Sequence, residues 1–73
     1  MNYYAVRLPN LTTVIIKTDY GHRQLARKIK ESYGIVGPGN TVYNVDNYES
    51  LYKLDSPDER QQRVALTLED LVT

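Results

Sequence analysis

Hydrophobic positions recur with a period of two at the start of the chain. One side of residues 2–8 carries Tyr4, Val6 and Leu8, and such alternation is typical of a strand with one buried face. Residues 12–18 are rich in β-branched side chains and follow a short Pro-Asn-Leu break. Because β-branched residues favour strands and short breaks favour hairpins, the pattern predicts an antiparallel pair of strands here.

The period changes to that of an α-helix over residues 20–33. One face of the predicted helix collects the residues His22, Leu25, Ala26, Ile29 and Tyr33. Thr18 or Asp19 can cap the start of this helix, and Gly34 stands where a left-handed residue would end it. The spacing therefore predicts an amphipathic helix whose apolar stripe packs on the two strands.

The second half of the chain has weaker and more ambiguous patterns. Residues 34–40 contain too much glycine and proline for a regular element, so we expect a loop there, followed by a short strand. For residues 48–54 two interpretations remain open. Asp46 with Glu49 three residues later is a capping box that favours a short helix, whereas a turn at Asp46 favours a second hairpin. Of the two, we favour the helix.

Residues 56–72 begin with a clear helix signal but lack a clear end. Ser56 can cap the helix, and the proline that follows suits its first position. If the helix ran to the last residues, Glu69 and Asp70 would lie at its negative end without a cation to offset them. Hydrophobic residues alternate from residue 63 onward, so we expect one helical turn followed by a strand.

These elements together predict a small α+β fold. We expect residues 1–73 to form one domain, with an antiparallel or mixed sheet of about four strands. The expected order is strand, strand, helix, strand, short helix and strand, with one main amphipathic helix packed on one face of the sheet. A chain of this length buries only a small core, so its stability should be marginal, and a partner or a second copy would complete the core.

Composition excludes several classes of function. The chain has no cysteine, which rules out disulfides, thiolate metal sites and redox motifs. No apolar run approaches the roughly 20 residues of a membrane span, and the N-terminus lacks the pattern of a signal peptide. We therefore expect a soluble protein of the cytoplasm that has no membrane partner.

Basic and acidic residues are distributed unevenly along the chain, although the net charge is zero. Six lysines and arginines accompany two acidic residues in the part that ends at Gly37, and the balance inverts beyond it. This distribution predicts one positive and one negative surface, which suits association with a charged partner or with a second copy.

No motif in the sequence points to catalysis or to a cofactor. His22 is the only histidine, and none of the serines lies in a nucleophile elbow. The glycine-rich loop follows a helix, whereas phosphate-binding loops precede one. Asp55, Asp58 and Glu59 are the closest set of carboxylates, but their spacing is not that of a calcium loop. We expect no enzyme activity, no cofactor and no metal site.

All seven aromatic residues are tyrosines, which suit half-buried positions and are enriched at protein interfaces. We interpret the chain as a non-enzymatic protein-protein interaction module, a small inhibitor or adaptor that binds a protein partner or forms a homodimer through a strand edge. A viral origin, in a phage, is a conjecture that no residue supports. The partner-binding residues of this interpretation are Tyr3, Ile15, Tyr43, Tyr48 and Tyr52. Rings that simply cover a small core are the alternative.

A basic helix face supports an alternative function, nucleic-acid binding. Arg23, Arg27 and Lys30 are spaced to form one row on the predicted helix, and such a row can neutralise phosphates. The full set of residues in this alternative site is Lys17, Arg23, Arg27, Lys28 and Lys30. The zero net charge and the lack of a nucleic-acid motif count against it, and a solvated helix face is the simpler explanation.

Overall fold

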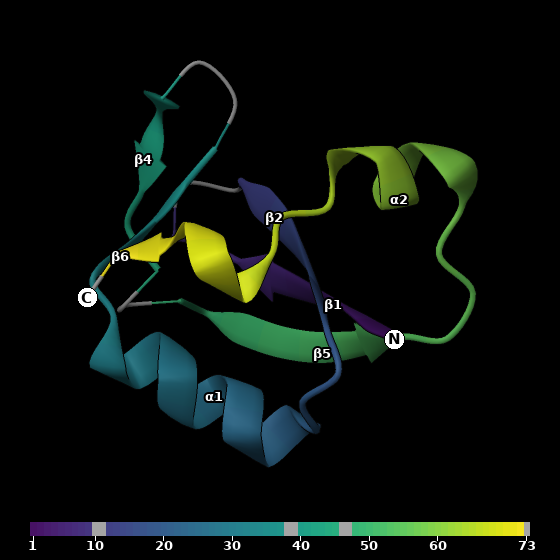
Figure 1. Ribbon diagram of the computed structural model, residues 1–73, viewed down its shortest axis with the longest axis horizontal. Coiled ribbons are helices and arrows are strands. Elements are labelled where there is room, and N and C mark those ends of the chain that lie inside the picture. The colour runs from purple at the N-terminus through teal and green to yellow at the C-terminus, as the bar shows by residue number, and fades with distance from the viewer. Residues whose placement is uncertain (10–11, 38–39, 46–47, 73) are drawn as a thin grey trace.

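The protein has an α+β fold, as the sequence predicts (Figure 1). The computed structural model describes residues 1–9, 12–37, 40–45 and 48–72. Its elements in chain order are β1 (Asn2–Arg7), β2 (Thr13–Thr18), α1 (His22–Glu31), β3 (Gly34–Val36), β4 (Val42–Tyr43), β5 (Ser50–Leu54), α2 (Glu59–Val64), the 3₁₀ helix η2 (Leu68–Asp70) and β6 (Leu71–Val72). Strands β2-β1-β5 form one antiparallel sheet, sheet A, and β4-β3-β6 form a second, sheet B. The strands are thus divided between two sheets rather than gathered in one.

The predicted pair of strands is confirmed as β1 and β2. Tyr4 lies opposite Ile16 and Val6 lies opposite Val14, and all four side chains are buried. Successive side chains of a strand point to opposite faces of the sheet. The hydrophobic residues that alternate in the sequence therefore lie together on the inner face of the sheet. Strand β1 is central in sheet A, with β5 on its other side.

Helix α1 packs its apolar stripe against the core, as predicted. Leu25 and Ile29 are 0% exposed, while Ala26 is half-buried and His22 is exposed at the margin of the stripe. Tyr33, which we expected on the same face, lies beyond the end of α1 and is 59% exposed. Burial of the inner stripe turns the opposite side of α1, with its arginines, toward solvent.

Helix α1 starts later and ends differently from our prediction. Gly21 is the N-cap residue, and its backbone N–H donates to Gln24 Oε1 at 3.4 Å. Thr18, a predicted cap, instead accepts a hydrogen bond of 3.1 Å from the Tyr20 N–H and shapes the turn before the helix. At the other end, Ser32 donates both its backbone N–H and its hydroxyl to the carbonyl three residues earlier.

Gly34 does not end α1 in a left-handed conformation, because it lies in strand β3. A Cβ at this position would lie 2.8 Å from Val42 Cγ1 on the neighbouring strand, so glycine lets β3 and β4 approach closely. Part of the predicted loop is therefore a strand, and Ile35 within it is completely buried. Burial of apolar side chains outweighs the local turn signal here. Residues 38 and 39 of the predicted loop lie outside the described residues.

Strand β5 replaces the helix that we favoured for residues 48–54, so that prediction is wrong. Leu51 lies opposite Val6 of β1 and packs against the core. Pairing with β1 satisfies backbone groups on the free side of that strand, which a short helix would not do. Asp46, on which both interpretations depended, lies outside the described residues.

The C-terminal segment contains a helix, as expected, but with a different cap. Asp58 rather than Ser56 is the N-cap of α2, and its Oδ1 accepts a 2.7 Å hydrogen bond from the Gln61 N–H. The strand that we expected next is reduced to a parallel bridge between Leu66 and Ile16 and to the two residues of β6. A local side-chain network, rather than strand pairing, shapes the chain between them.

That network places two acidic residues at the start of η2. Asp70 Oδ2 accepts hydrogen bonds from the Thr67 N–H at 3.0 Å and from the Thr67 hydroxyl at 3.3 Å. Glu69 and Asp70 both belong to the first turn of this 3₁₀ helix. Carboxylates are favourable at the N-terminal end of a helix. The two acidic residues therefore do not lie at the negative end of a helix, as they would if α2 ran to the end of the chain.

The core lies between the two sheets and α1. Its buried residues are Tyr4, Val6, Leu8, Val14, Ile16, Leu25, Ile29, Ile35 and Val45. Helices α1 and α2 lie at opposite sides of the molecule (Figure 1), so charges on the two helices belong to separate surfaces. Among the described residues, no helix is long and apolar enough to cross a bilayer.

Candidate functional site

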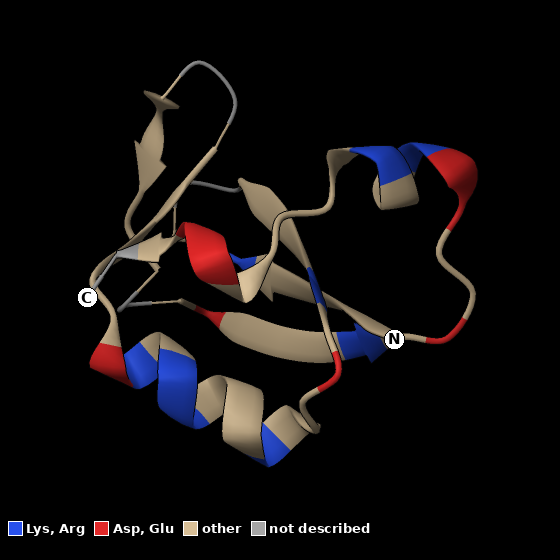
Figure 2. Cartoon of the chain, in the orientation of Figure 1, with Lys and Arg blue, Asp and Glu red and all other residues tan. Residues whose placement is uncertain are grey.

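The outward side of α1 carries most of the predicted basic site. Arg23, Arg27, Lys28 and Lys30 are all exposed, and Figure 2 shows the basic residues as blue segments along the helix. None of the four forms an ion pair with a residue in the described part of the chain. Their charges are therefore available to a partner.

The four cations of α1 point to two sides of the helix. Arg23, Arg27 and Lys30 follow an i, i+4, i+7 spacing and form one row, which we call the basic stripe. Lys28 projects from the other side, where it lines a hollow beside the helix. The fifth predicted residue, Lys17, is half-buried on β2 and is not part of the stripe. The predicted basic site is thus divided into a stripe and two separate lysines.

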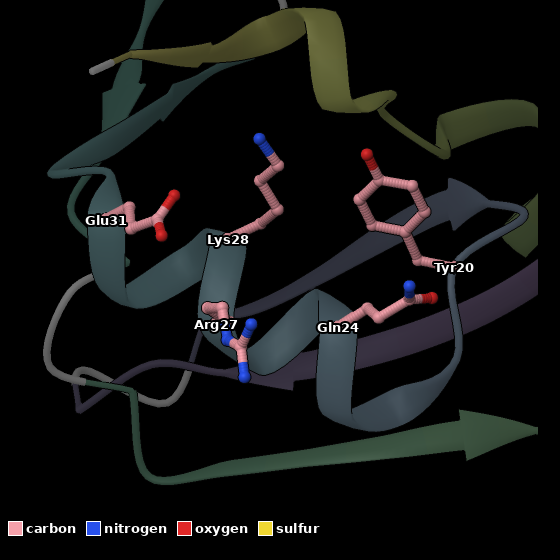
Figure 3. A pocket seen from close by; sticks show the side chains of 5 residues that line it. All are labelled: Tyr20, Gln24, Arg27, Lys28 and Glu31. Carbon is pink, nitrogen blue, oxygen red and sulfur yellow. The ribbon is translucent and has the colours of Figure 1, made fainter.

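A groove lies between α1 and the C-terminal segment of the chain, and Tyr20 lines both of its parts. Its first part has a volume of about 260 Å³ and is lined by Tyr20, Gln24, Arg27, Lys28 and Glu31 (Figure 3). A second part of about 340 Å³ has as its lining residues Tyr20, Lys28, Glu31, Leu68, Glu69 and Leu71. We call these eight residues together the Tyr20 groove.

Side chains of the Tyr20 groove share one open space. In Figure 3 the hydroxyl of Tyr20 and the ammonium of Lys28 both point toward the chain of η2 and β6, whereas Arg27 points away from them. A molecule in the groove would therefore meet an aromatic ring and a cation together. Arg27 belongs to both surfaces, so it links the basic stripe to the groove.

Hydrogen bonds fix the backbone around Tyr20. Tyr4 donates its hydroxyl to the Tyr20 carbonyl at 2.9 Å, and the Tyr20 N–H donates to Thr18 Oγ1 at 3.1 Å. The Tyr20 ring is half-buried and packs partly against the core. The backbone that carries the ring is therefore fixed, which reduces part of the conformational entropy that binding would cost.

The floor of the groove is apolar and its rim is charged. Leu68 and Leu71 are half-buried and pack against the core. Lys28, Glu31 and Glu69 are exposed at the rim, and no ion pair among the described residues includes them. A partly accessible apolar floor inside a ring of unpaired charges has the anatomy of a protein interface, with its apolar centre and polar rim.

Ile15, a predicted partner-binding residue, is only 7% exposed. It faces away from Val14 and Ile16 along the strand, as the alternation predicts. Val64 and Leu66 line a hollow beside it, and the Leu66 N–H donates to the Ile15 carbonyl at 2.8 Å. The segment of α2 and Leu66 therefore covers Ile15, and our prediction that this side chain is free to contact a partner needs correction.

The four tyrosines of the predicted partner site divide into two pairs. Tyr43 and Tyr48 are half-buried against the core, which fits the alternative that rings cover a small core. Tyr3 and Tyr52 lie on the outward face of sheet A, where Tyr52 is 51% exposed. The register, with Ala5 opposite Tyr52, makes these two tyrosines diagonal neighbours. Of the five predicted residues, Tyr3 and Tyr52 thus come together on sheet A, and Ile15 and Tyr43 line one hollow.

The edges of sheet A are partly covered. His22 Nε2 lies 2.9 Å from the carbonyl oxygen of Leu51 in β5. On β2, the Lys17 N–H donates to the Leu66 carbonyl at 2.7 Å. An added strand needs free backbone groups at a sheet edge, so these contacts disfavour binding through the edges of sheet A.

We find no catalytic constellation among the described residues. His22 bonds to a backbone carbonyl rather than to a serine or a carboxylate. Within the same residues, no group of three or more His, Asp or Glu side chains could hold a metal ion. Of the carboxylates singled out in the sequence, Asp58 caps α2 and Glu59 pairs with Arg63 at 3.3 Å. These two carboxylates have structural roles in α2.

Comparison with known proteins assigns no family to the chain. No family model matches the sequence, and no curated protein or solved structure matches it. A proposal for the function therefore rests on the exposed surfaces of the molecule.

Proposed function

We propose that the protein is a non-enzymatic interaction module, an inhibitor or adaptor, that binds another protein through the outward side of α1. The observation that carries this proposal is the Tyr20 groove, an apolar floor beside α1 with exposed charges of both signs around it. Protein interfaces combine an apolar centre with a polar rim, and tyrosine and arginine dominate their binding energy. Tyr20 and Arg27 supply both residue types at one place.

The charges around the groove favour a protein over a nucleic acid. Glu31 and Glu69 line the same part of the groove as Lys28. Carboxylates repel a phosphate backbone, whereas a protein can offer charges of both signs. The zero net charge also provides no overall attraction to a polyanion. A surface of mixed charge selects a partner with a complementary pattern.

Affinity capture from the native host tests the proposal. The wild-type protein should retain a host protein that the Arg27→Glu variant loses. Arg27 lies between the basic stripe and the Tyr20 groove, and a glutamate in its place would repel an acidic residue of the partner. Arg60→Glu is the matched control, since Arg60 is exposed on α2 at the opposite side of the molecule. Retention of the host protein by Arg27→Glu, or its loss with Arg60→Glu, would contradict the proposal.

A second copy of the chain is one form that the protein partner can take. In that case the mass measured by gel filtration should rise with protein concentration, because association follows mass action. The Arg27→Glu variant should keep the mass of a single chain at every concentration. A monomer that captures a host protein favours the inhibitor or adaptor instead.

Nucleic-acid binding through the basic stripe is the second candidate function. The observation that favours it is the row of Arg23, Arg27 and Lys30, which is exposed and forms no ion pair with the described residues. Three phosphate contacts on duplex DNA would give a slope of about −3 in a plot of log affinity against log salt. Titration with DNA and RNA at low salt, repeated with Arg23→Glu, tests it. Weak binding that Arg23→Glu leaves unchanged would remove this candidate.

A further inference from the structure

The Tyr20 groove continues on the far side of Tyr20. A third hollow of about 330 Å³ shares Tyr20, Leu68 and Glu69 with the second part of the groove and adds Lys17 on β2. We include this hollow in the Tyr20 groove from here on. The groove therefore runs from Lys17, past Tyr20, to Lys28. Helix α1 beside it has ten residues, or about 15 Å of length. That length matches about four or five residues of extended chain, so the groove suits a short peptide segment.

Of the side chains along this groove that form no ion pair with a described residue, three are basic and two are acidic. They are Lys17, Arg27, Lys28, Glu31 and Glu69. Asp19 also lines the third hollow, but its carboxylate lies 3.8 Å from the N-terminal amine and is already paired. Arg23 and Lys30 on the neighbouring stripe add further positive charge. Charge complementarity therefore favours an acidic segment.

We propose that the Tyr20 groove binds an acidic peptide segment of the partner protein that carries one apolar anchor residue. This inference rests on the proposed function and names the chemistry of its ligand. The anchor packs on Leu68 and Leu71 beside the Tyr20 ring, where it removes apolar surface from water. Carboxylates on either side of the anchor pair with Lys17 and Lys28 across the groove.

A single strand of nucleic acid is the main competing occupant. Its bases would stack on an aromatic ring such as Tyr20. Its phosphates, however, would approach Glu31 and Glu69 at the rim, and every phosphate carries the same charge as these carboxylates. A peptide can place an acidic residue at Lys28 and a neutral or basic residue at Glu31. The arrangement of charges therefore favours the peptide.

Peptide display on the full-length protein tests this inference. Random short peptides are selected for binding, and fluorescence anisotropy then measures the affinity of the best sequences. We expect the selected peptides to share a large apolar residue flanked by Asp or Glu. The Lys28→Glu variant should bind them about tenfold more weakly, while Arg60→Glu should bind them like the wild type.

A charge-swapped peptide makes the test more specific. A selected peptide with lysine in place of its acidic residues should bind Lys28→Glu better than it binds the wild type. Selected peptides without acidic residues, or with unchanged affinity for Lys28→Glu, would overturn the inference. Selection of no peptide would also overturn it, and binding of a thymidine oligonucleotide that Lys28→Glu loses would then point to nucleic acid.

Further comparisons distinguish a binding defect from a folding defect, and failure of this inference from failure of the proposed function. Lys28 is exposed, so Lys28→Glu should fold, and circular dichroism of each variant checks this. If peptide selection fails while Arg27→Glu still abolishes capture of a host protein, the inference about the groove falls and the proposed function stands. If Arg27→Glu leaves capture unchanged as well, both fall.

Discussion

His22 Nε2 donates a hydrogen bond of 2.9 Å to the backbone carbonyl oxygen of Leu51. A carbonyl only accepts, so this ring nitrogen carries a hydrogen. The bond joins the first residue of α1 to strand β5, and the same ring meets the Tyr4 ring in an edge-on contact with centroids 6.3 Å apart. His22 thus positions the start of the helix whose outward side we propose as the binding surface.

Removal of the His22 side chain should loosen this junction. His22→Ala should lower the free energy of unfolding by about 1 kcal/mol, the typical net contribution of one hydrogen bond. It should also leave the edge of β5 open to self-association. Urea denaturation and gel filtration measure the two effects, with His22→Gln, which keeps a donor, as the control. Equal stability of all three proteins would show that the bond contributes nothing.

Ile29 should be a major source of stability, because it fixes α1 to the core and is 0% exposed. Ile29→Ala should lower the free energy of unfolding by about 2–5 kcal/mol through lost burial and a residual cavity. Loss of this size is a large part of the stability of a small protein. Urea denaturation should find the neighbouring exposed Lys30→Ala variant close to wild type. An Ile29→Ala protein of unchanged stability would refute the burial of this helix face.

Two glycines should respond differently to replacement by alanine. A Cβ at Gly34 would lie 2.8 Å from Val42 Cγ1 and 3.1 Å from the Tyr43 carbonyl oxygen, whereas one at Gly21 would meet no atom within 4 Å. Gly34→Ala should therefore cost about 1–3 kcal/mol through overpacking, and Gly21→Ala less than about 1 kcal/mol. Thermal denaturation compares the two variants, and the reverse order would contradict the close approach of β3 and β4.

A Tyr52 variant tests whether the partner binds at α1 or at the tyrosines that the sequence suggests. Tyr52 is 51% exposed on the outward face of sheet A, away from the Tyr20 groove. Tyr52→Ala should leave capture of the host protein unchanged, whereas Arg27→Glu abolishes it. If Tyr52→Ala abolishes capture instead, the partner binds sheet A, and Tyr3 beside it becomes the next residue to test.

Local periodicity predicts the elements whose hydrophobic residues line one face of a regular strand or helix. The alternation around Tyr4 and Val6 identifies the hairpin, and the spacing of Leu25 and Ile29 identifies α1, because each pattern matches the period of its element. The exposure of Arg23 and the rest of the basic stripe then follows from the burial of the opposite stripe. This part of the candidate site can be read from the sequence.

Contacts between distant segments explain what the sequence does not predict. Strand β5 forms because one side of β1 is free to pair with it, and no sequence pattern within residues 48–54 indicates that pairing. Ile15 is covered because α2 and Leu66 return along β2. The alternation gives the face on which a side chain lies, but it does not reveal whether a later segment covers that face.

The Tyr20 groove depends on the return of the C-terminal segment. Leu68 and Leu71 reach Tyr20 only because η2 turns the chain back toward α1. One sequence signal could have indicated η2, since Thr67 and Asp70 have the three-residue spacing of a capping box. Even so, the partner of that turn lies far away in the chain, and periodicity carries no information about it.

Site-specific photo-crosslinking in the native host is the measurement that tests the α1 binding surface most directly. A photoreactive residue replaces Lys30 on α1 in one protein and Arg60 on α2 in the other, and both are exposed cations. We predict a covalent adduct with a protein, or with a second copy of the chain, from the Lys30 position and none from the Arg60 position. An adduct from the Arg60 position alone, or from neither, would contradict a binding surface on α1.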